Sequence, residues 1–84
     1  MDSDIFTSKI VVKAFGLLSE KLNASEITME ITNDINEFVD ELNKKYPQLK
    51  ELQFNIAVNK KIVQHNVALK VTDEIALLPP FSGG

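Results

Sequence analysis

Apolar and polar residues follow two different spacings along this chain, and the change between them predicts a mixed α+β fold. Residues 9–15 and 54–58 are short stretches rich in apolar side chains, and residues 27–31 alternate apolar with polar positions; all three predict strands. Residues 62–63 and 75–78 predict two further short strands, with a turn at residues 59–61 between the third and fourth. In residues 34–46 the apolar side chains instead recur at i, i+3, i+4 and i+7, which predicts an amphipathic helix.

The ends of this helix carry signals of their own. We expect Thr32 or Asn33 to cap its start, with acidic residues following in its first turn. Tyr46 precedes a proline, and such a residue avoids the α conformation, so the helix should stop there. A shorter helix is predicted at residues 17–23. The apolar stripe of the main helix is expected to cover the sheet and consists of Ile35, Phe38, Val39 and Leu42.

The order of these elements limits the topology. Five strands and one main helix can cover each other in two layers, and a β-grasp roll satisfies the order. The first and last strands of such a roll lie side by side in parallel. We therefore expect one β-grasp domain over residues 1–78 and an extended tail over residues 79–84.

Composition narrows the classes of function. The chain has 84 residues, a net charge of -3, nine basic residues that are all Lys, and no Cys. Scattered lysines balanced by acids argue against nucleic-acid binding, and the absence of Cys excludes disulfides and Cys-based metal sites. No apolar run is long enough to span a bilayer, and the start of the chain does not resemble a secretory signal, so we expect no membrane partner and a cytoplasmic location.

The tail contains the candidate chemistry. Pro79 and Pro80 favour a stiff extended segment, and six extended residues reach about 20 Å. Gly83 and Gly84 have no side chains and can enter a narrow channel in a partner. The reactive group at the end is the α-carboxylate of Gly84, which needs activation by ATP. No GxxxxGK[ST] phosphate loop is present, so a partner must supply that step.

Other candidate residues have plainer interpretations. His65 lacks an apparent catalytic partner and is interpreted as loop surface. Asp73 and Glu74 are interpreted as part of a turn, and two carboxylates alone make no metal site. Lys60 and Lys61 are interpreted as a solvated turn, with contact to an acidic partner surface as the alternative.

The C-terminal residues carry a family resemblance. Asp73-Glu74 followed by Ile75-Ala76-Leu77-Leu78-Pro79-Pro80-Phe81-Ser82-Gly83-Gly84 resembles the signature of the small, sulfur-carrying subunit of molybdopterin synthase. That family belongs to the ubiquitin-like β-grasp sulfur carriers. The sequence departs from the family pattern at Thr72, where Gly is frequent, and at Phe81, where a smaller Val or Ile is commoner.

The resemblance implies a function without an active site on this chain. An adenylyltransferase similar to ubiquitin-activating enzymes would adenylate Gly84 with its own ATP, and sulfur would then be installed as a thiocarboxylate. The tail, residues Pro79, Pro80, Phe81, Ser82 and Gly83, would thread into the large subunit of a heterotetrameric synthase. The resemblance also implies a docking patch of Phe15, Ile62 and Leu78. It implies no bound cofactor or metal.

Two other functions stay open on the sequence. The thiazole-forming sulfur carrier of thiamine synthesis shares the β-grasp fold and Gly-Gly end, but usually lacks the Pro-Pro-x-Ser-Gly-Gly run. A ubiquitin-like modifier would instead join its terminal Gly to target lysines. An incidental Gly-Gly end on a binding module is a third, blander interpretation.

Overall fold

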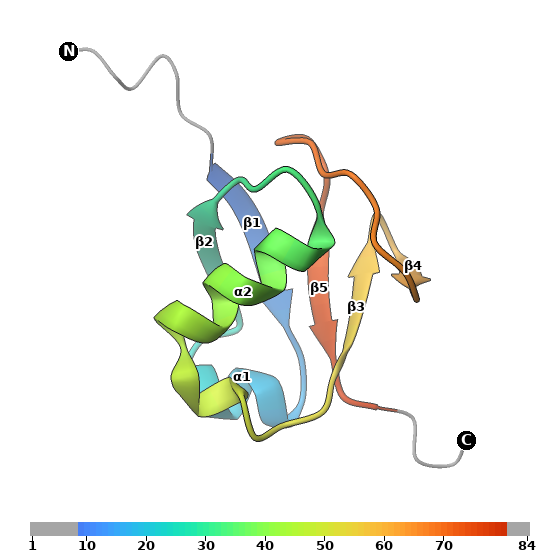
Figure 1. Ribbon diagram of the computed structural model, residues 1–84. Coiled ribbons are helices and arrows are strands. Elements are labelled where there is room, and N and C mark those ends of the chain that lie inside the picture. The colour runs from blue at the N-terminus through green and yellow to red at the C-terminus, as the bar shows by residue number, and fades with distance from the viewer. Residues whose placement is uncertain (1–8, 81–84) are drawn as a thin grey trace, which may run out of the picture.

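The structure of the protein is a computed structural model, which describes residues 9–80 (Figure 1). The first half contains strand β1 (Lys9–Ala14), helix α1 (Leu17–Leu22), strand β2 (Glu26–Glu30) and helix α2 (Ile35–Lys45). A 3-10 helix (Pro47–Leu49) follows, and then come β3 (Asn55–Val58), β4 (Lys61–Val63) and β5 (Ile75–Leu78). Each predicted strand and helix is therefore present, with ends that differ by at most one residue.

The five strands form one mixed sheet in the order β2-β1-β5-β3-β4 (Figure 1). β5 lies between β1, with which it is parallel, and β3, with which it is antiparallel. Both outer pairs, β1 with β2 and β3 with β4, are antiparallel hairpin neighbours. The parallel pairing of the first and last strands confirms the β-grasp roll expected from the element order.

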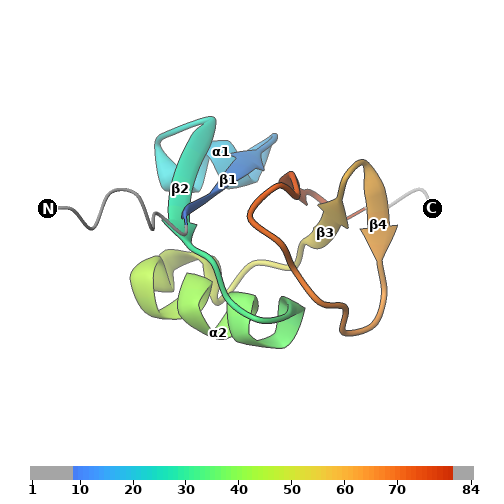
Figure 2. The same cartoon turned by 90° about the horizontal axis from the view of Figure 1, so that it is seen from above.

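Helix α2 lies on one side of the sheet, as the view from above shows (Figure 2). Its buried residues Ile35, Phe38 and Leu42 face the sheet, and Val39 packs against the same core while partly exposed. From β1 the core receives alternate residues, including Ile10 and Val12. The predicted helical stripe is confirmed as the cover of the sheet.

The start of α2 differs from the prediction. Its cap is Asp34, whose carboxylate accepts a hydrogen bond from the backbone N–H of Glu37 at 3.0 Å. Thr32 and Asn33 do not cap the helix, so that expectation is wrong. The Glu37 carboxylate accepts from the backbone N–H of Asn33 at 3.1 Å, which makes an exchange of bonds similar to a capping box. Thr32 is occupied elsewhere, because its hydroxyl donates to the carbonyl of Asp34.

Two supporting segments close the ends of the core. Leu18 and Leu22 of α1 are buried, as their i, i+4 spacing predicts. The 3-10 helix after Pro47 was not predicted, and it places Leu49 fully inside the core. Within residues 9–80, no helix has both the length and the apolar character needed to cross a membrane.

We predict that Phe38→Ala lowers the free energy of unfolding by about 3–5 kcal/mol, because Phe38 is 0% exposed and its ring would leave a cavity. Urea denaturation monitored by circular dichroism measures this loss. Phe15→Ala, which trims a ring that is 47% exposed, is the control and should cost less than about 1 kcal/mol. Equal losses for the two variants would contradict the assigned core.

Candidate functional site

The face of the sheet opposite α2 has no cover within residues 9–80. Because side chains alternate along a strand, burying Val12 and Ala14 turns Lys13 and its neighbours toward this open face. One row of the face crosses four strands: Lys13 is level with Ala76, Ala76 with Ala57, and Ala57 with Ile62. Two alanines thus occupy the middle of the row, where larger side chains flank them.

These small residues leave a hollow of about 350 Å³ on the open face. Its apolar walls come from Phe15, Ile62 and Leu78, and its polar rim from Lys13, Lys60 and Glu74, with Ala57 and Ala76 between them. Phe15 is 47% exposed and Ile62 is 40% exposed, while Leu78 is partly buried. The structure therefore brings the three predicted patch residues around one hollow; their docking role stays a prediction. We call the eight residues of this hollow the docking hollow.

The tail leaves the domain beside the docking hollow. The backbone N–H of Phe15 donates to the carbonyl of Leu77 at 3.1 Å, which holds the end of β1 against the end of β5. Pro79 then lies over Gly16, where a Cβ atom would come within 2.8 Å of the proline ring. Gly16 also has a φ of 60°, a conformation that side chains disfavour. Of the predicted tail residues, Phe81, Ser82, Gly83 and Gly84 lie outside the described part of the chain.

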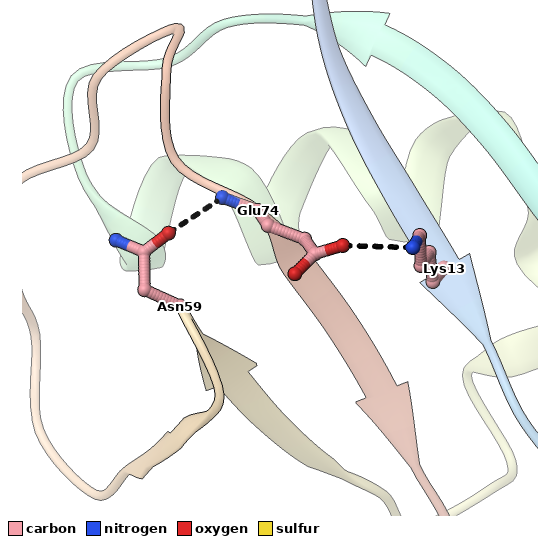
Figure 3. A network of polar contacts seen from close by, with 3 residues as sticks. All are labelled: Lys13, Asn59 and Glu74. Carbon is pink, nitrogen blue, oxygen red and sulfur yellow. Dashed lines mark hydrogen bonds and ion pairs between the residues drawn. The ribbon is translucent and has the colours of Figure 1, made fainter.

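An ion pair crosses the open face at the other end of the docking hollow (Figure 3). Lys13 Nζ of β1 lies 2.8 Å from a carboxylate oxygen of Glu74, the residue before β5. The hydrogen bond and the charge of Lys13 lower the pKa of Glu74, and Glu74 in turn raises the pKa of Lys13. Both side chains are well exposed, so the ion pair contributes little to the free energy of unfolding. Its main effect is to hold the two charged groups in fixed positions.

Asn59 joins the β3–β4 turn to the start of β5. Its side-chain oxygen accepts from the backbone N–H of Glu74 at 3.0 Å, and its amide nitrogen donates to Asp73 at 2.9 Å (Figure 3 shows the first bond). Its own backbone N–H donates to the carbonyl of Glu74 at 2.8 Å. Asp73 also accepts from the backbone N–H of Lys70, and these bonds lower the pKa of Asp73, that from Asn59 most. We call these contacts the Asn59 bracket.

The remaining polar candidates do not converge on a reaction centre. His65 is exposed in the loop after β4, as its interpretation as loop surface predicted. A second hollow of about 510 Å³ between α2 and β3 is lined by one ionisable residue, Lys50, which offers no acid–base pair. Across residues 9–80, no three His, Asp or Glu side chains come close enough together to hold a metal ion.

Comparison with known proteins decides the family. The model of the ThiS family matches residues 12–84, which include the docking hollow, Gly16 and the Gly-Gly end. The chain belongs to the ThiS family. A relative described as the molybdopterin synthase sulfur carrier subunit of Mycobacterium tuberculosis is 31% identical over 81 residues, covering 90% of this chain and 98% of the relative.

This ThiS-family chain is also similar to solved structures of the same fold. It is similar to a chain in the complex of subunits 1 and 2 of molybdopterin-converting factor from Helicobacter pylori, with 30% identity and a TM-score of 0.68. That match covers 90% of this chain and 99% of the other. It is also similar to small archaeal modifier protein 1 from Methanosarcina acetivorans, with 29% identity, a TM-score of 0.76, and coverage of 92% and 97%.

For this member of the ThiS family, sequence reasoning missed three features of the site. Gly16 was interpreted only as the end of a strand, whereas it makes room for Pro79 at the base of the tail. Ala57 and Ala76 were not assigned to the predicted patch, because small residues leave a hollow only once their strands become neighbours. The Asn59 bracket had a local signal, an Asn in a predicted turn, but its bonds reach 14 and 15 residues along the chain.

We predict that the folded state loses stability in acid through two carboxylates, that of Asp73 in the Asn59 bracket and that of Glu74 in its ion pair with Lys13. The folded-state pKa values of Asp73 and Glu74 lie below their ordinary values of 3.8 and 4.5. Their contribution is therefore complete above those values and is lost as the pH falls through the lower folded-state values. The urea midpoint should be constant near neutral pH and fall below about pH 4.5. Asp73→Asn should be less stable at neutral pH, and its deficit should shrink in acid.

A charge-matched control separates the bracket from general acid effects. Glu51→Gln removes one carboxylate from an exposed site far from Asn59, and its urea midpoints should follow those of the wild type at each pH. A constant deficit of Asp73→Asn at all pH values would contradict a role for the ionised carboxylate.

Proposed function

We propose that this chain is the sulfur-carrying subunit of a molybdopterin synthase, and that the α-carboxylate of Gly84 carries the sulfur. One observation carries the proposal: a family-typical Pro-Pro-x-Ser-Gly-Gly tail leaves the domain directly beside an apolar hollow on an uncovered sheet face. A domain that must dock on an enzyme and deliver its terminus into that enzyme needs both features together. The molybdopterin synthase sulfur carrier subunit that is 31% identical supports the same function.

The chemistry begins with activation of Gly84 by a partner. A carboxylate oxygen attacks the α-phosphate of ATP, pyrophosphate leaves, and the acyl adenylate forms. A sulfur nucleophile then attacks the acyl carbon, and AMP departs with the former bonding electrons. If the nucleophile is hydrosulfide, loss of its proton leaves Gly84 as a thiocarboxylate. If it is a persulfide, the product is an acyl disulfide, and a thiol must reduce its S–S bond to release the thiocarboxylate and form a disulfide with the donor. The ATP belongs to the adenylyltransferase similar to ubiquitin-activating enzymes, and this chain binds no cofactor of its own.

In the sulfur-transfer step, the catalytic residues belong to the large subunit. The tail inserts into the large subunit, where sulfur passes from Gly84 to a pterin precursor of the molybdenum cofactor. This chain contributes position: the docking hollow holds the domain on its partner, and Pro79 against Gly16 sets the direction in which the tail leaves. It is a non-catalytic subunit, acts in the cytoplasm and assembles with a dimeric large subunit as a heterotetramer. The complex of subunits 1 and 2 named for the similar Helicobacter pylori structure supports a two-subunit assembly.

We predict that Phe15→Asp weakens binding to the large subunit by about tenfold or more, because it places a charge on an apolar wall of the docking hollow. Isothermal titration calorimetry measures the affinity, and circular dichroism checks the fold. Val71→Asp is the matched control: Val71 is 49% exposed but does not line the hollow, so its variant should bind normally. Equal weakening by both variants would count against docking at this hollow.

We predict that deletion of Gly84 abolishes molybdopterin formation while leaving the fold and the affinity for the large subunit unchanged. The shortened terminus would lie about 3.3–3.6 Å from the reacting position, and smaller misplacements already slow reactions a hundredfold. Mass spectrometry should find sulfur in place of one oxygen on Gly84 of the intact chain, after incubation with adenylyltransferase, ATP and a sulfur donor. Full activity of the truncated chain would rule out the carrier function.

A modifier function is the second candidate, because the similar Methanosarcina acetivorans structure is named a small archaeal modifier protein. Under that function Gly84 would be found in isopeptide bonds with lysines of other proteins. Peptide mapping of the chain purified from its own cells distinguishes the two, since a carrier ends in a free carboxylate or a thiocarboxylate. Transfer of sulfur to a thiazole-forming enzyme instead of the large subunit would favour the thiamine carrier.

A further inference from the structure

The turn between β3 and β4 contains a lysine in an unfavourable conformation. Val58 pairs with Lys61, so the loop consists of Asn59 and Lys60 alone. Their φ angles are 52° and 73°, the positive values that a type I′ hairpin turn requires at both positions. Asn tolerates this region, but Gly is the residue favoured at the second position, and a lysine there is strained. Strain of this kind points toward a use for the side chain.

Lys60 is also the cation at the docking hollow that lacks a close partner among residues 9–80. Lys13 and Glu74 are already joined at 2.8 Å, whereas Lys60 takes part in no ion pair within this range. Its charge lowers the pKa of Glu74 only as the last of several causes, after the hydrogen bond and charge of Lys13. The neighbouring Lys61 is exposed on β4 and does not line the hollow.

A protein docked on this face would bring Lys60 out of water. Lys60 lines the apolar hollow, and its ammonium group would be poorly solvated once Phe15 and Ile62 were covered. A buried cation without a partner opposes binding, and a nearby carboxylate removes that cost. The carboxylate of Glu74 is held by Lys13, so the docked protein must bring its own.

We propose that Lys60 binds a carboxylate of the docked protein, presented beside an apolar side chain that rests on Ala57 and Ala76. The docked protein is the large synthase subunit, and in that respect the inference rests on the proposed function. The rim of the hollow has two lysines and one glutamate, so its net positive charge favours a partner surface that presents a carboxylate. The similar Helicobacter pylori chain is part of a complex of subunits 1 and 2, which supports a second subunit as the occupant. A partner with a neutral residue at that point would bind more weakly, and one with a basic residue more weakly still. Lys60 is thus a specificity-determining residue, held in a strained turn.

The proposal assigns two opposite effects to Lys60: it lowers the stability of the free domain and raises the affinity for the large subunit. The experiment measures both. Lys60→Gly relieves the turn strain, so its melting temperature should equal that of the wild type or rise by up to about 6 °C. Its Kd for the large subunit should nevertheless increase about threefold to tenfold, measured by titration calorimetry at low and physiological salt. Lys60→Asn keeps a residue that tolerates positive φ and should show the same weakening, with a smaller salt dependence than the wild type.

Two controls isolate the charge and its position. Lys60→Arg retains the cation and should retain most of the affinity, whereas Lys61→Gln removes a charge one residue away and should bind as the wild type does. Sedimentation of the chain alone tests a second copy as the occupant, and a dimer that dissociates in Lys60→Asn would overturn the proposal. Unchanged affinity of Lys60→Asn, or equal weakening by Lys61→Gln, would overturn it as well. Failure of the wild-type chain to bind the large subunit would instead contradict the proposed function and, with it, this inference.

Discussion

The insertion of β5 between β1 and β3 is the interaction on which the rest of the structure depends. This strand is four residues long, and its Ile75 and Leu77 are fully buried against the core under α2. It joins two hairpins that would otherwise share no strand partner, because β1 pairs with β2 and β3 with β4. Isolated two-stranded hairpins are marginal in water, so the central strand makes one stable sheet from two weak ones.

The same insertion creates the hollow on the open face of the sheet. Burial of Ile75 and Leu77 turns Ala76 and Leu78 toward the open face, since successive side chains of a strand point to opposite sides. Ala76 then lies level with Lys13 on one side and Ala57 on the other, and the docking hollow forms over the two alanines. The strand that completes the core is therefore also the strand that begins the tail.

Polar contacts hold in place the end of this surface that lies away from the tail, and they contribute little to the stability of the whole domain. The Asn59 bracket holds the β3–β4 turn against the start of β5, and it thereby fixes where Lys60 and Glu74 stand relative to each other. The side-chain hydrogen bonds of the bracket are exposed, so each contributes modestly to the free energy of unfolding. Exposed charges at a docking face affect the rate and selectivity of association more than the stability of the free domain.

The sequence by itself determined the elements, the core stripe of α2 and the motif of the tail, because these depend on spacing and residue type within a few turns of chain. Ile35, Phe38 and Leu42 follow a helical period, and the tail motif is contiguous. Only the tertiary structure decided that Asp34 caps α2 in place of Thr32 or Asn33. All three residue types are favoured at the N-cap position, so the geometry of the chain selects among them. The tertiary structure alone also decided the docking hollow, the seat of Pro79 on Gly16 and the Asn59 bracket. Each joins residues far apart in the chain, and strand order, which no local pattern encodes, decides which of them become neighbours.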